Sequence, residues 1–416
     1  MINKTLWTRN FKLIVLSCVI GAIVGEATML PISYSAYEQT KSPFLSMMVT
    51  VVSFAPDVFV SIFAGTLIDR SNKKNVVLWL NTAFAIAFLA AGIYLNTYSF
   101  NYNMLLLFTF IISVISAFEN LAFMSIFPEI ITKGMESKAF SVTNMIYPLM
   151  TIVLAPLSSY IYKVIGLGNM MYIAFVLTII GNINIALIQY ERPEYSKSTN
   201  KFIDDFKSGI NYLKNDPALM KLYLFLAVYG AIGIPSSEIM RMLFQSTPGL
   251  GVVLYGVASS VEMASRVIFG SLYYKKGLQK NKRIKISAAV HLLYAPTTLI
   301  AFMLGYPVYL VQGFVMRGLG QITYTMRSAC VAKYLKPEMK GRAYSVSTLL
   351  TSLISIPVTI LVGFIAEGMP LMYMLVAVTI LETMIVYFMF VKNMKLFNPI
   401  YMMDIDVNDK SDNEME

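Results

Sequence analysis

Long apolar runs alternate with short polar segments along almost the whole chain. Each run reaches the length of about 20 residues that a helix needs to cross the hydrocarbon core of a bilayer. The pattern predicts an all-α membrane protein with twelve transmembrane helices in two groups of six. The predicted spans are residues 11–38, 43–68, 76–97, 104–127, 138–163 and 169–190 in the first group, and 218–243, 250–274, 284–305, 307–331, 342–366 and 370–391 in the second.

A polar stretch between the two groups sets the predicted domain boundaries. We expect an N-terminal six-helix bundle over residues 1–190, a cytoplasmic linker over 191–217, a C-terminal six-helix bundle over 218–392 and a cytoplasmic tail over 393–416. In the linker, four apolar residues recur at helical spacing, which predicts a short amphipathic helix on the membrane surface. These residues are Phe202, Phe206, Ile210 and Leu213.

The two groups of spans also resemble each other in sequence. The segment "SKAFSVTNM" (137–145) matches "GRAYSVSTL" (341–349), which lies 204 residues further on, close to half of the 416-residue chain. This offset predicts that the two halves are parallel pseudo-repeats of six helices each.

Composition and charge support the membrane assignment. Hydrophobic residues make up 57% of the chain and charged residues only 13%, whereas soluble proteins carry roughly 25% charged residues. Of the 33 lysines and arginines, 27 lie in the termini and in the loops on the same side as the termini. Because positive residues remain on the cytoplasmic side, both termini are expected there. The net charge of +10 is therefore attributed to topology and not to nucleic-acid binding.

Enzymatic, metal and cofactor chemistry find no support in the sequence. It contains no Walker-type glycine-rich loop, no Gly-x-Ser-x-Gly nucleophile motif and no residue cluster with metal-ligand spacing. The two cysteines, Cys18 and Cys330, both lie in apolar spans. We therefore expect no catalytic residue, no metal site and no cofactor.

Three acidic residues, Glu26, Asp57 and Glu119, lie well inside the predicted spans of the first half, whose basic residues lie only at span ends (Lys12, Lys138 and Lys163). A charge at the bilayer centre costs about 2.5–3.5 kcal/mol on insertion scales, so such residues are candidates for function. We expect Glu26 and Asp57 to carry a coupling proton or to contact a cationic substrate. The alternative is that the carboxyl groups are neutral, hydrogen-bonded within the bundle and without a role in transport.

In the second half, two acids have basic neighbours on the same helix. Glu238 lies three residues before Arg241, and Glu262 lies four residues before Arg266. This spacing favours ion pairs along one helix face, and therefore a structural role, although Glu262 remains a candidate for proton coupling.

Three further polar residues of the second half lie in predicted spans. Arg317 is expected deep in the membrane, where it favours an anionic substrate group or stabilises Glu382. Arg327 lies near the cytoplasmic end of its span and is expected to extend toward water. The only histidine, His291, is expected to be a polar packing residue, with a proton relay as the alternative.

The loop after the second span carries a family motif. Residues 64–75, "AGTLIDRSNKKN", resemble the Gly-x-x-x-Asp-Arg-x-Gly-basic-basic motif between helices 2 and 3 of the major facilitator superfamily, with Asn72 in place of the second glycine. Asparagine tolerates the left-handed backbone geometry that glycine adopts. The resemblance extends over nearly the whole chain. It implies the major facilitator fold, whose two halves rock against each other around a central site.

Three further segments narrow the resemblance: "LWTRNFKLIVLS" (6–17), "DFKSGINYLKNDPAL" (205–219) and "KPEMKGRAYS" (336–345). In these segments the chain is similar to the macrolide-efflux group of drug–proton antiporters within that superfamily. The chain departs from the family's antiporter motif on helix 5, keeping only Ala155-Pro156 and Ser158-Ser159, and helix 4 has no arginine.

The motif also implies a gate. Asp69 lies at the end of helix 2, and the start of helix 11 offers Arg342 together with free backbone N–H groups and a positive helix dipole. In the family fold these elements meet when the cytoplasmic side is closed, so we expect Asp69 and Arg342 to latch the outward-facing state. The complete set of gating candidates is Gly65, Asp69, Arg70, Lys73, Lys74, Gly341 and Arg342.

The same fold implies a substrate cavity between helices 1, 2, 4 and 5 of the first half and helices 7, 8, 10 and 11 of the second. Aromatic side chains are expected in its wall because they form adaptable apolar sites. The candidates are Tyr34, Tyr37, Phe118, Tyr147, Tyr229 and Tyr324.

These features predict a secondary active transporter of the bacterial inner membrane that exports amphipathic drugs or macrolide-like compounds by proton-coupled alternating access. Its expected partners are a small amphipathic substrate, protons and the lipid bilayer, with no nucleic acid, and we expect a monomer. The alternatives are an exporter or flippase for a lipid, a siderophore or another metabolite, an importer, and a membrane sensor that does not transport.

Overall fold

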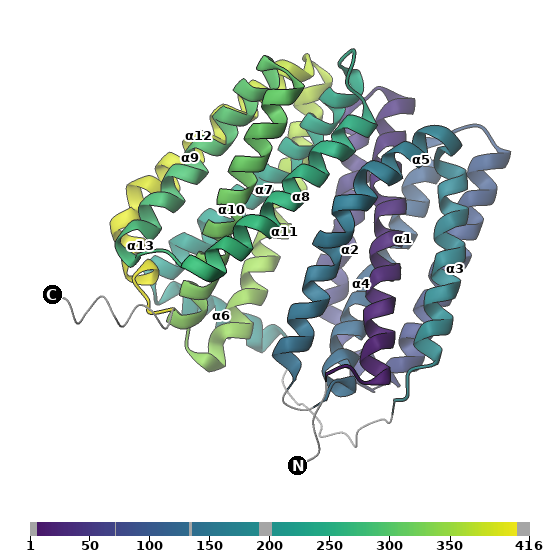
Figure 1. Cartoon of the computed structure of the whole chain (residues 1–416), viewed down its shortest axis with the longest axis horizontal. Coiled ribbons are helices and arrows are strands. Elements are labelled where there is room, and N and C mark those ends of the chain that lie inside the picture. The colour runs from purple at the N-terminus through teal and green to yellow at the C-terminus, as the bar shows by residue number, and fades with distance from the viewer. Residues whose placement is uncertain (1–5, 71, 133–134, 191–201, 406–416) are drawn as a thin grey trace. The chain divides into compact units, whose positions relative to one another are not determined.

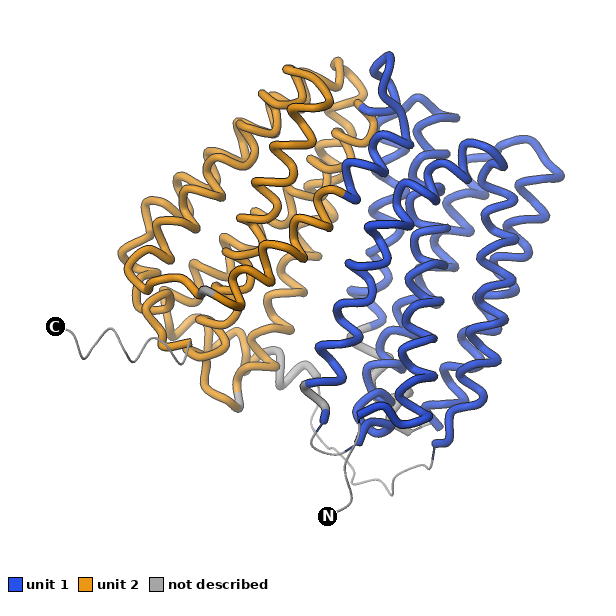
Figure 2. Tube along the Cα trace, in the orientation of Figure 1, with its two compact units in different colours: residues 1–197, 244–260 blue, residues 198–243, 261–416 orange. Residues whose placement is uncertain are grey.

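The computed structural model describes residues 6–70, 72–132, 135–190 and 202–405; within these ranges the side chains of 61–70, 136–137, 202–206, 276 and 338 are not described. In this part of the chain all secondary structure is helical, with no strand (Figure 1). Contacts in space between residues divide the chain into two compact units. Unit 1 comprises residues 1–197 and 244–260, and unit 2 comprises residues 198–243 and 261–416 (Figure 2).

Unit 1 is built on five long helices. Two predicted spans, 138–163 and 169–190, form a single element, α5, in which Gly166 has a φ of 76° and a ψ of 171° that interrupt the helical geometry. Because glycine adopts a positive φ without steric cost, this residue separates the two membrane crossings. The five helices are α1 (Arg9–Thr40), α2 (Pro43–Arg70), α3 (Lys73–Thr97), α4 (Tyr102–Ile130) and α5 (Glu136–Ala186).

Unit 2 contains most of the remaining helices, although α7 ends and α8 begins in residues 244–260 of unit 1. The helices are α6 (Phe202–Lys214), α7 (Pro217–Ser246), α8 (Val252–Lys276), α9 (Lys280–Leu304), α10 (Tyr306–Tyr334), α11 (Lys340–Glu367), α12 (Leu371–Ile385) and α13 (Met394–Tyr401), with 3₁₀ turns at Pro337–Met339 and Val391–Asn393 and a π-helical turn at Val386–Phe390.

Ten helices in the described part of the chain are long and apolar enough to cross a membrane. α5 counts once among them although it holds two predicted spans, and α10, which carries Arg317 and Arg327, lies outside the ten. Each of the twelve predicted spans therefore corresponds to a helix or to one arm of α5. Hydropathy predicts these elements well because a segment in hydrocarbon must satisfy its own backbone hydrogen bonds, and a helix does so.

Asn72, which replaces the second glycine of the motif, lies directly before α3. It has a φ of −74° and a ψ of 104°, which is extended backbone. Its side-chain oxygen accepts a hydrogen bond from the backbone N–H of Asn75 at 3.3 Å. Asn72 is thus the N-cap of the helix, a position that asparagine favours.

The last predicted span, 370–391, continues past its expected end into α13. This helix contacts α9 and α10, and Phe397, Ile400 and Tyr401 are fully buried there. The first residues of the predicted tail, 393–416, are therefore part of the packed structure of unit 2.

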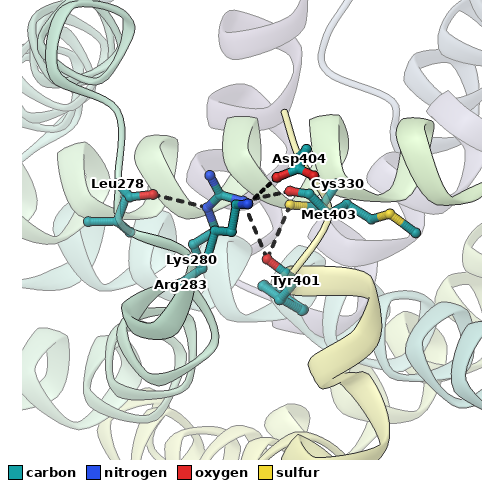
Figure 3. A network of polar contacts seen from close by, with 7 residues as sticks. All are labelled: Leu278, Lys280, Arg283, Cys330, Tyr401, Met403 and Asp404. Atoms are coloured by element: carbon teal, nitrogen blue, oxygen red, sulfur yellow. Dashed lines mark hydrogen bonds and ion pairs between the residues drawn. The ribbon is translucent and has the colours of Figure 1, made fainter. Parts of the chain in front are cut away.

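A buried arginine fastens the chain that follows α13 (Figure 3). Arg283, near the start of α9, is 0% exposed. Its Nε donates to the carbonyl oxygen of Leu278 at 3.0 Å. Its Nη1 donates to the carbonyl oxygens of Tyr401 at 3.5 Å and Met403 at 2.8 Å. One side chain thus joins the α8–α9 loop to the end of α13.

A second, exposed contact lies beside this arginine. Lys280 forms an ion pair with Asp404 (Figure 3). The hydrogen bond from Lys280 holds the pKa of the Asp404 carboxyl below its ordinary value. A depressed folded-state pKa means that this contribution to stability is present at neutral pH and is lost as the pH falls through the lowered value.

The linker helix α6 packs on protein. Leu213 is fully buried in the core of unit 2, and a Cβ at Gly209 would lie only 3.0 Å from the carbonyl oxygen of Arg342 on α11. The expectation of a helix on the membrane surface is corrected for this face, because α11 covers it. The side chains of Phe202 and Phe206 lie outside those described.

Candidate functional site

Glu26 lies on α1 with its side chain inside unit 1, 4% exposed. Thr151 of α5 donates a hydrogen bond to its Oε1 at 2.8 Å, and Tyr147, one turn earlier on α5, lies within hydrogen-bonding reach of the same carboxyl. Ser158, also on α5, donates to the backbone carbonyl of Glu26 at 2.7 Å. Among the described residues the Glu26 carboxyl forms no ion pair. It is a buried acid held by neutral groups.

The other two predicted acids of the first half lie in different settings. Asp57, which follows Pro56 on α2, is exposed on the surface of unit 1. Glu119 on α4 lines a cavity of about 290 Å³ inside unit 1 together with Cys18 and Asn81. The structure does not gather the acids into one cluster, and no three His, Cys, Asp or Glu of the described residues lie where they could hold a metal ion.

Three of the aromatic wall candidates lie in the core of unit 1. Tyr34 is fully buried, with its hydroxyl 3.2 Å from Ser159 Oγ. Tyr37 is buried as well, and Phe118 packs partly buried against a core cluster. These side chains are packed within unit 1, and their place in the wall of a cavity between the two halves stays a prediction. Tyr147, beside Glu26, is 51% exposed.

The gating candidates of α2 are Gly65, Asp69 and Arg70, and their side chains lie outside those that the structure describes. Gly341, at the start of α11, has open space where a Cβ would lie. The latch between Asp69 and Arg342 therefore stays a prediction.

Arg342, the other partner of that latch, contacts the linker helix inside unit 2. Its Nη1 donates a hydrogen bond to Ser208 Oγ of α6 at 3.1 Å. Arg342 is thereby oriented by a neighbour that the sequence comparison of the two halves did not indicate.

The two lysines of the motif are anchored in unit 1. Lys73 is 4% exposed and forms an ion pair with Glu129 of α4 at 2.6 Å. The other carboxylate oxygen of Glu129 accepts a hydrogen bond from the hydroxyl of Tyr190 at 2.7 Å. Lys74 donates to two carbonyl oxygens at the C-terminal end of α5, both at 2.7 Å. Beyond any effect on topology, these lysines join the start of α3 to the ends of α4 and α5.

We expect Lys73→Met to lower the free energy of unfolding by about 2 kcal/mol, because it leaves the partly buried Glu129 carboxylate without its cation. Thermal denaturation of the purified protein measures the effect. The double variant Lys73→Met/Glu129→Gln is expected to recover part of the loss, since the uncompensated charge is then removed. An unchanged melting temperature for Lys73→Met would contradict the structural role of the pair.

Unit 2 holds a cavity of about 500 Å³ between α7, α8, α9 and α10. Arg266, Arg317 and Arg327 line it, together with Tyr229 and Tyr324. Three predicted site residues, Arg317 and the two tyrosines, thus face the same space.

Glu262 finds its partner on another helix. Its carboxylate pairs with Arg317 of α10 at 2.8 Å, so the prediction of a pair with Arg266 on the same helix was wrong. The reason is the close approach of α8 and α10, where a Cβ at Gly318 would lie only 2.5 Å from Ser265 Oγ. At this distance an arginine on the facing helix can reach the carboxylate.

Two other acids of unit 2 are buried. Glu238 forms the predicted ion pair with Arg241. Glu382 is 4% exposed and lines a smaller cavity of about 160 Å³ that also includes Arg317 and Tyr229.

His291 is a buried polar residue between aromatic rings. Its Nδ1 lies 2.6 Å from the carbonyl oxygen of Ser287, its Nε2 lies 3.5 Å from Nη1 of Arg327, and its ring stacks on Phe390. The expectation that Arg327 extends toward water is corrected, because the guanidinium group turns to this imidazole nitrogen.

Sequence reasoning missed Thr151, Ser158 and the cavity position of Arg266. The first two had a readable signal, since Tyr147, Thr151 and Ser158 follow one another at four and seven residues and so share one face of a helix. Arg266 had no such signal, because its assignment as a partner of Glu262 satisfied the local pattern.

Known proteins are similar in sequence to this chain over most of its length. The sequence model of the Major Facilitator Superfamily matches residues 14–359. Macrolide efflux protein A of Streptococcus pyogenes is 22% identical over 361 residues, which cover 83% of this chain and 87% of the relative. Macrolide efflux protein A of Enterococcus faecalis is 21% identical over 321 residues, which cover 74% and 96%.

Solved transporter structures share the fold. The nucleoside transporter NupG superposes with a TM-score of 0.70 at 15% identity, covering 94% of this chain and 99% of the other. A POT family transporter in complex with 5-aminolevulinic acid gives 0.74 at 9% identity, covering 93% and 96%. The twelve-helix fold predicted from the sequence is confirmed. Because the family match spans most of a chain built on this fold, the protein is a multi-pass membrane transporter that belongs to the major facilitator superfamily.

Proposed function

We propose that this transporter is a secondary active exporter of small amphipathic, macrolide-like molecules and that proton movement drives it. The observation that carries the proposal is the Glu26 site, in which a carboxyl group is buried on a membrane-spanning helix and is held only by neutral partners from α5. The relatives named Macrolide efflux protein A support the direction of transport and the class of cargo.

A carboxyl group in this setting is stable in two states. It is neutral when protonated, and when ionised it needs a cation, because an isolated charge away from water is costly. Thr151 donates to the carboxyl in both forms, so the group keeps its position when its charge changes. Exchange of a proton for a cationic substrate, or release of the proton to the other side, then accompanies the conformational cycle.

The cycle itself follows from the repeat of the two halves. We place both termini in the cytoplasm and the protein in the bacterial inner membrane, because the loops on the side of the termini carry most of the basic residues. The Asp69–Arg342 latch is proposed to hold the cytoplasmic side closed. The cargo, the protons and the lipid bilayer are its partners, and the transporter acts as a monomer.

Reconstituted vesicles test the proposal. Purified protein is placed in liposomes that contain a pH-sensitive dye, a pH gradient is imposed, and erythromycin and other amphipathic compounds are added one at a time. We expect a transported compound to discharge the gradient faster than in protein-free vesicles. Movement of a radiolabelled compound without proton movement would contradict the coupling, and the absence of any movement across the panel would contradict the cargo class.

A further inference from the structure

A second site lies apart from Glu26, in the arginine-lined cavity of unit 2. Arg317 pairs there with Glu262 at 2.8 Å and stands over the ring of Tyr294 at 4.8 Å. Arg266 forms neither an ion pair nor a hydrogen bond with any residue in the described part of the chain. Two of the three arginines thus enter the cavity without a carboxylate, since Arg327 contacts only uncharged groups.

The contacts of His291 show that it is one of these uncharged groups. An arginine is always a donor, so Nε2 of His291 must accept from Nη1 of Arg327. Nδ1 then carries the proton and donates to the carbonyl oxygen of Ser287. One ring proton satisfies both contacts, so the imidazole is neutral and contributes no charge of either sign.

The charges around the cavity therefore do not cancel. Arg266, Arg317 and Arg327 bring three positive charges, and Glu262 neutralises one of them. Glu382, in the adjoining cavity beside Arg317, is the other nearby acid. Even with both carboxylates ionised, one positive charge remains. Positive charge without a partner is unfavourable inside a membrane bundle, and a bound anion would neutralise it.

We propose that this cavity binds an organic anion, a small molecule with an aromatic or apolar body and one carboxylate or phosphate group. Arg266 and Arg327 hold the anionic group through charge-assisted hydrogen bonds. The body lies against the tyrosine rings that line the cavity, Tyr229 and Tyr294 among them. The inference rests on the proposed function in one respect: it takes the bound anion to be the cargo. A negatively charged cargo selects the second coupling route given above, in which the Glu26 proton is released to the other side, over exchange for a cationic substrate.

The frame around the arginines is rigid. Ser265 donates to the backbone carbonyl of Phe314, which ties α8 to α10. Gly318 permits the close approach of these helices, because a Cβ there would collide with Phe269 and Ser265. Arg266 is adjacent to Ser265 and Arg317 is adjacent to Gly318 along their helices, so the site is fixed in position before a ligand binds.

Binding to the purified full chain in phosphatidylcholine nanodiscs tests the proposal. The probe is radiolabelled 2-naphthoate, and competition compares it with 2-naphthyl phosphate, the neutral 2-naphthylmethanol and the cationic 2-naphthylmethylammonium. We expect the two anions to compete at least about tenfold more strongly than the neutral and cationic analogues, as charge-assisted hydrogen bonds imply. The order of the two anions shows whether the site prefers a carboxylate or a phosphate.

Four variants locate the binding in this cavity. Arg266→Gln and Arg327→Gln are each expected to weaken 2-naphthoate binding about tenfold, and Arg266→Lys is expected to weaken it less. Glu262→Gln is expected to strengthen binding, because it releases Arg317 from its carboxylate; a merely structural role of the pair gives the opposite sign. Lys395→Gln, which removes the same charge from an exposed position, is the control and leaves binding unchanged.

The proposal is overturned if the neutral analogue binds as tightly as the anions, or if both Arg266→Gln and Arg327→Gln bind 2-naphthoate like the unaltered protein. Weaker binding by Glu262→Gln also counts against it. These outcomes are separate from the vesicle experiment, because equilibrium binding needs neither a gradient nor transport. A protein that binds 2-naphthoate but moves no protons refutes the proposed coupling and leaves the anion site standing.

Discussion

Replacement of Glu26 by glutamine is expected to abolish transport driven by a pH gradient while leaving the fold intact. Glutamine has nearly the same shape as glutamate, and its side-chain oxygen still accepts the hydrogen bond from Thr151. It cannot lose a proton, so the step that couples the gradient to the conformational change is removed. Gradient-driven uptake of a labelled substrate into vesicles of inverted orientation measures the loss.

Two companion measurements separate coupling from general damage. Exchange of labelled for unlabelled substrate, with no pH gradient, is expected to continue in Glu26→Gln if the cargo crosses without a net change in charge at this site. Glu367→Gln makes the same chemical change at an exposed position near the end of α11 and is expected to keep full gradient-driven uptake. Full gradient-driven uptake by both Glu26→Gln and Asp57→Asn would refute coupling through these carboxyl groups.

The positions of the helices could be predicted from the sequence because the membrane leaves few alternatives. A run of apolar residues in hydrocarbon forms a helix whatever its neighbours are, so the twelve spans followed from hydropathy alone. The exceptions occur where this constraint is absent. α13 is short and amphipathic, and its burial depends on contacts with α9 and α10 that a hydropathy profile does not contain.

The partners of the charged residues were harder to predict, because they lie on other helices. The spacing of Glu262 and Arg266 describes neighbours on an isolated helix surface, whereas the folded bundle offered Glu262 a closer partner in Arg317. Lys73 illustrates the same limit: read as a loop residue, it is buried against Glu129. The sequence locates the ionisable residues within apolar spans, but their partners could be found only from the three-dimensional structure.

The Glu26 site was predictable in part, less so than the helix positions and more so than the ion pairs. The acid was evident from the sequence because the basic residues of the first six spans lie only at span ends, far from Glu26. Its partners on α5 share one helix face and were open to prediction from their spacing. The contact between α1 and α5 that brings them to Glu26 is a property of the bundle.

Replacement of Arg283 by methionine is expected to lower the free energy of unfolding by about 4 kcal/mol, because three carbonyl groups lose their donor inside the protein. Methionine fills much of the space of the arginine stem but donates no hydrogen bond, so the carbonyls of Leu278, Tyr401 and Met403 are left without this partner. We expect α13 to detach first. Thermal denaturation reports the loss of stability. Limited trypsin digestion reports faster cleavage after Lys392 and Lys395, whose side chains are exposed but whose backbone is helical in the folded protein.

Lys280→Gln is the matched control for Arg283→Met, since it removes a cation from the same end of α9 and breaks only an exposed contact. Exposed ion pairs contribute little to stability, so this variant is expected to melt and to resist trypsin like the unaltered protein. The comparison therefore measures the effect of buried hydrogen bonds to the backbone against that of a surface charge three residues away. Equal melting temperatures for the two variants would show that α13 is held by its apolar residues alone and that the arginine is dispensable.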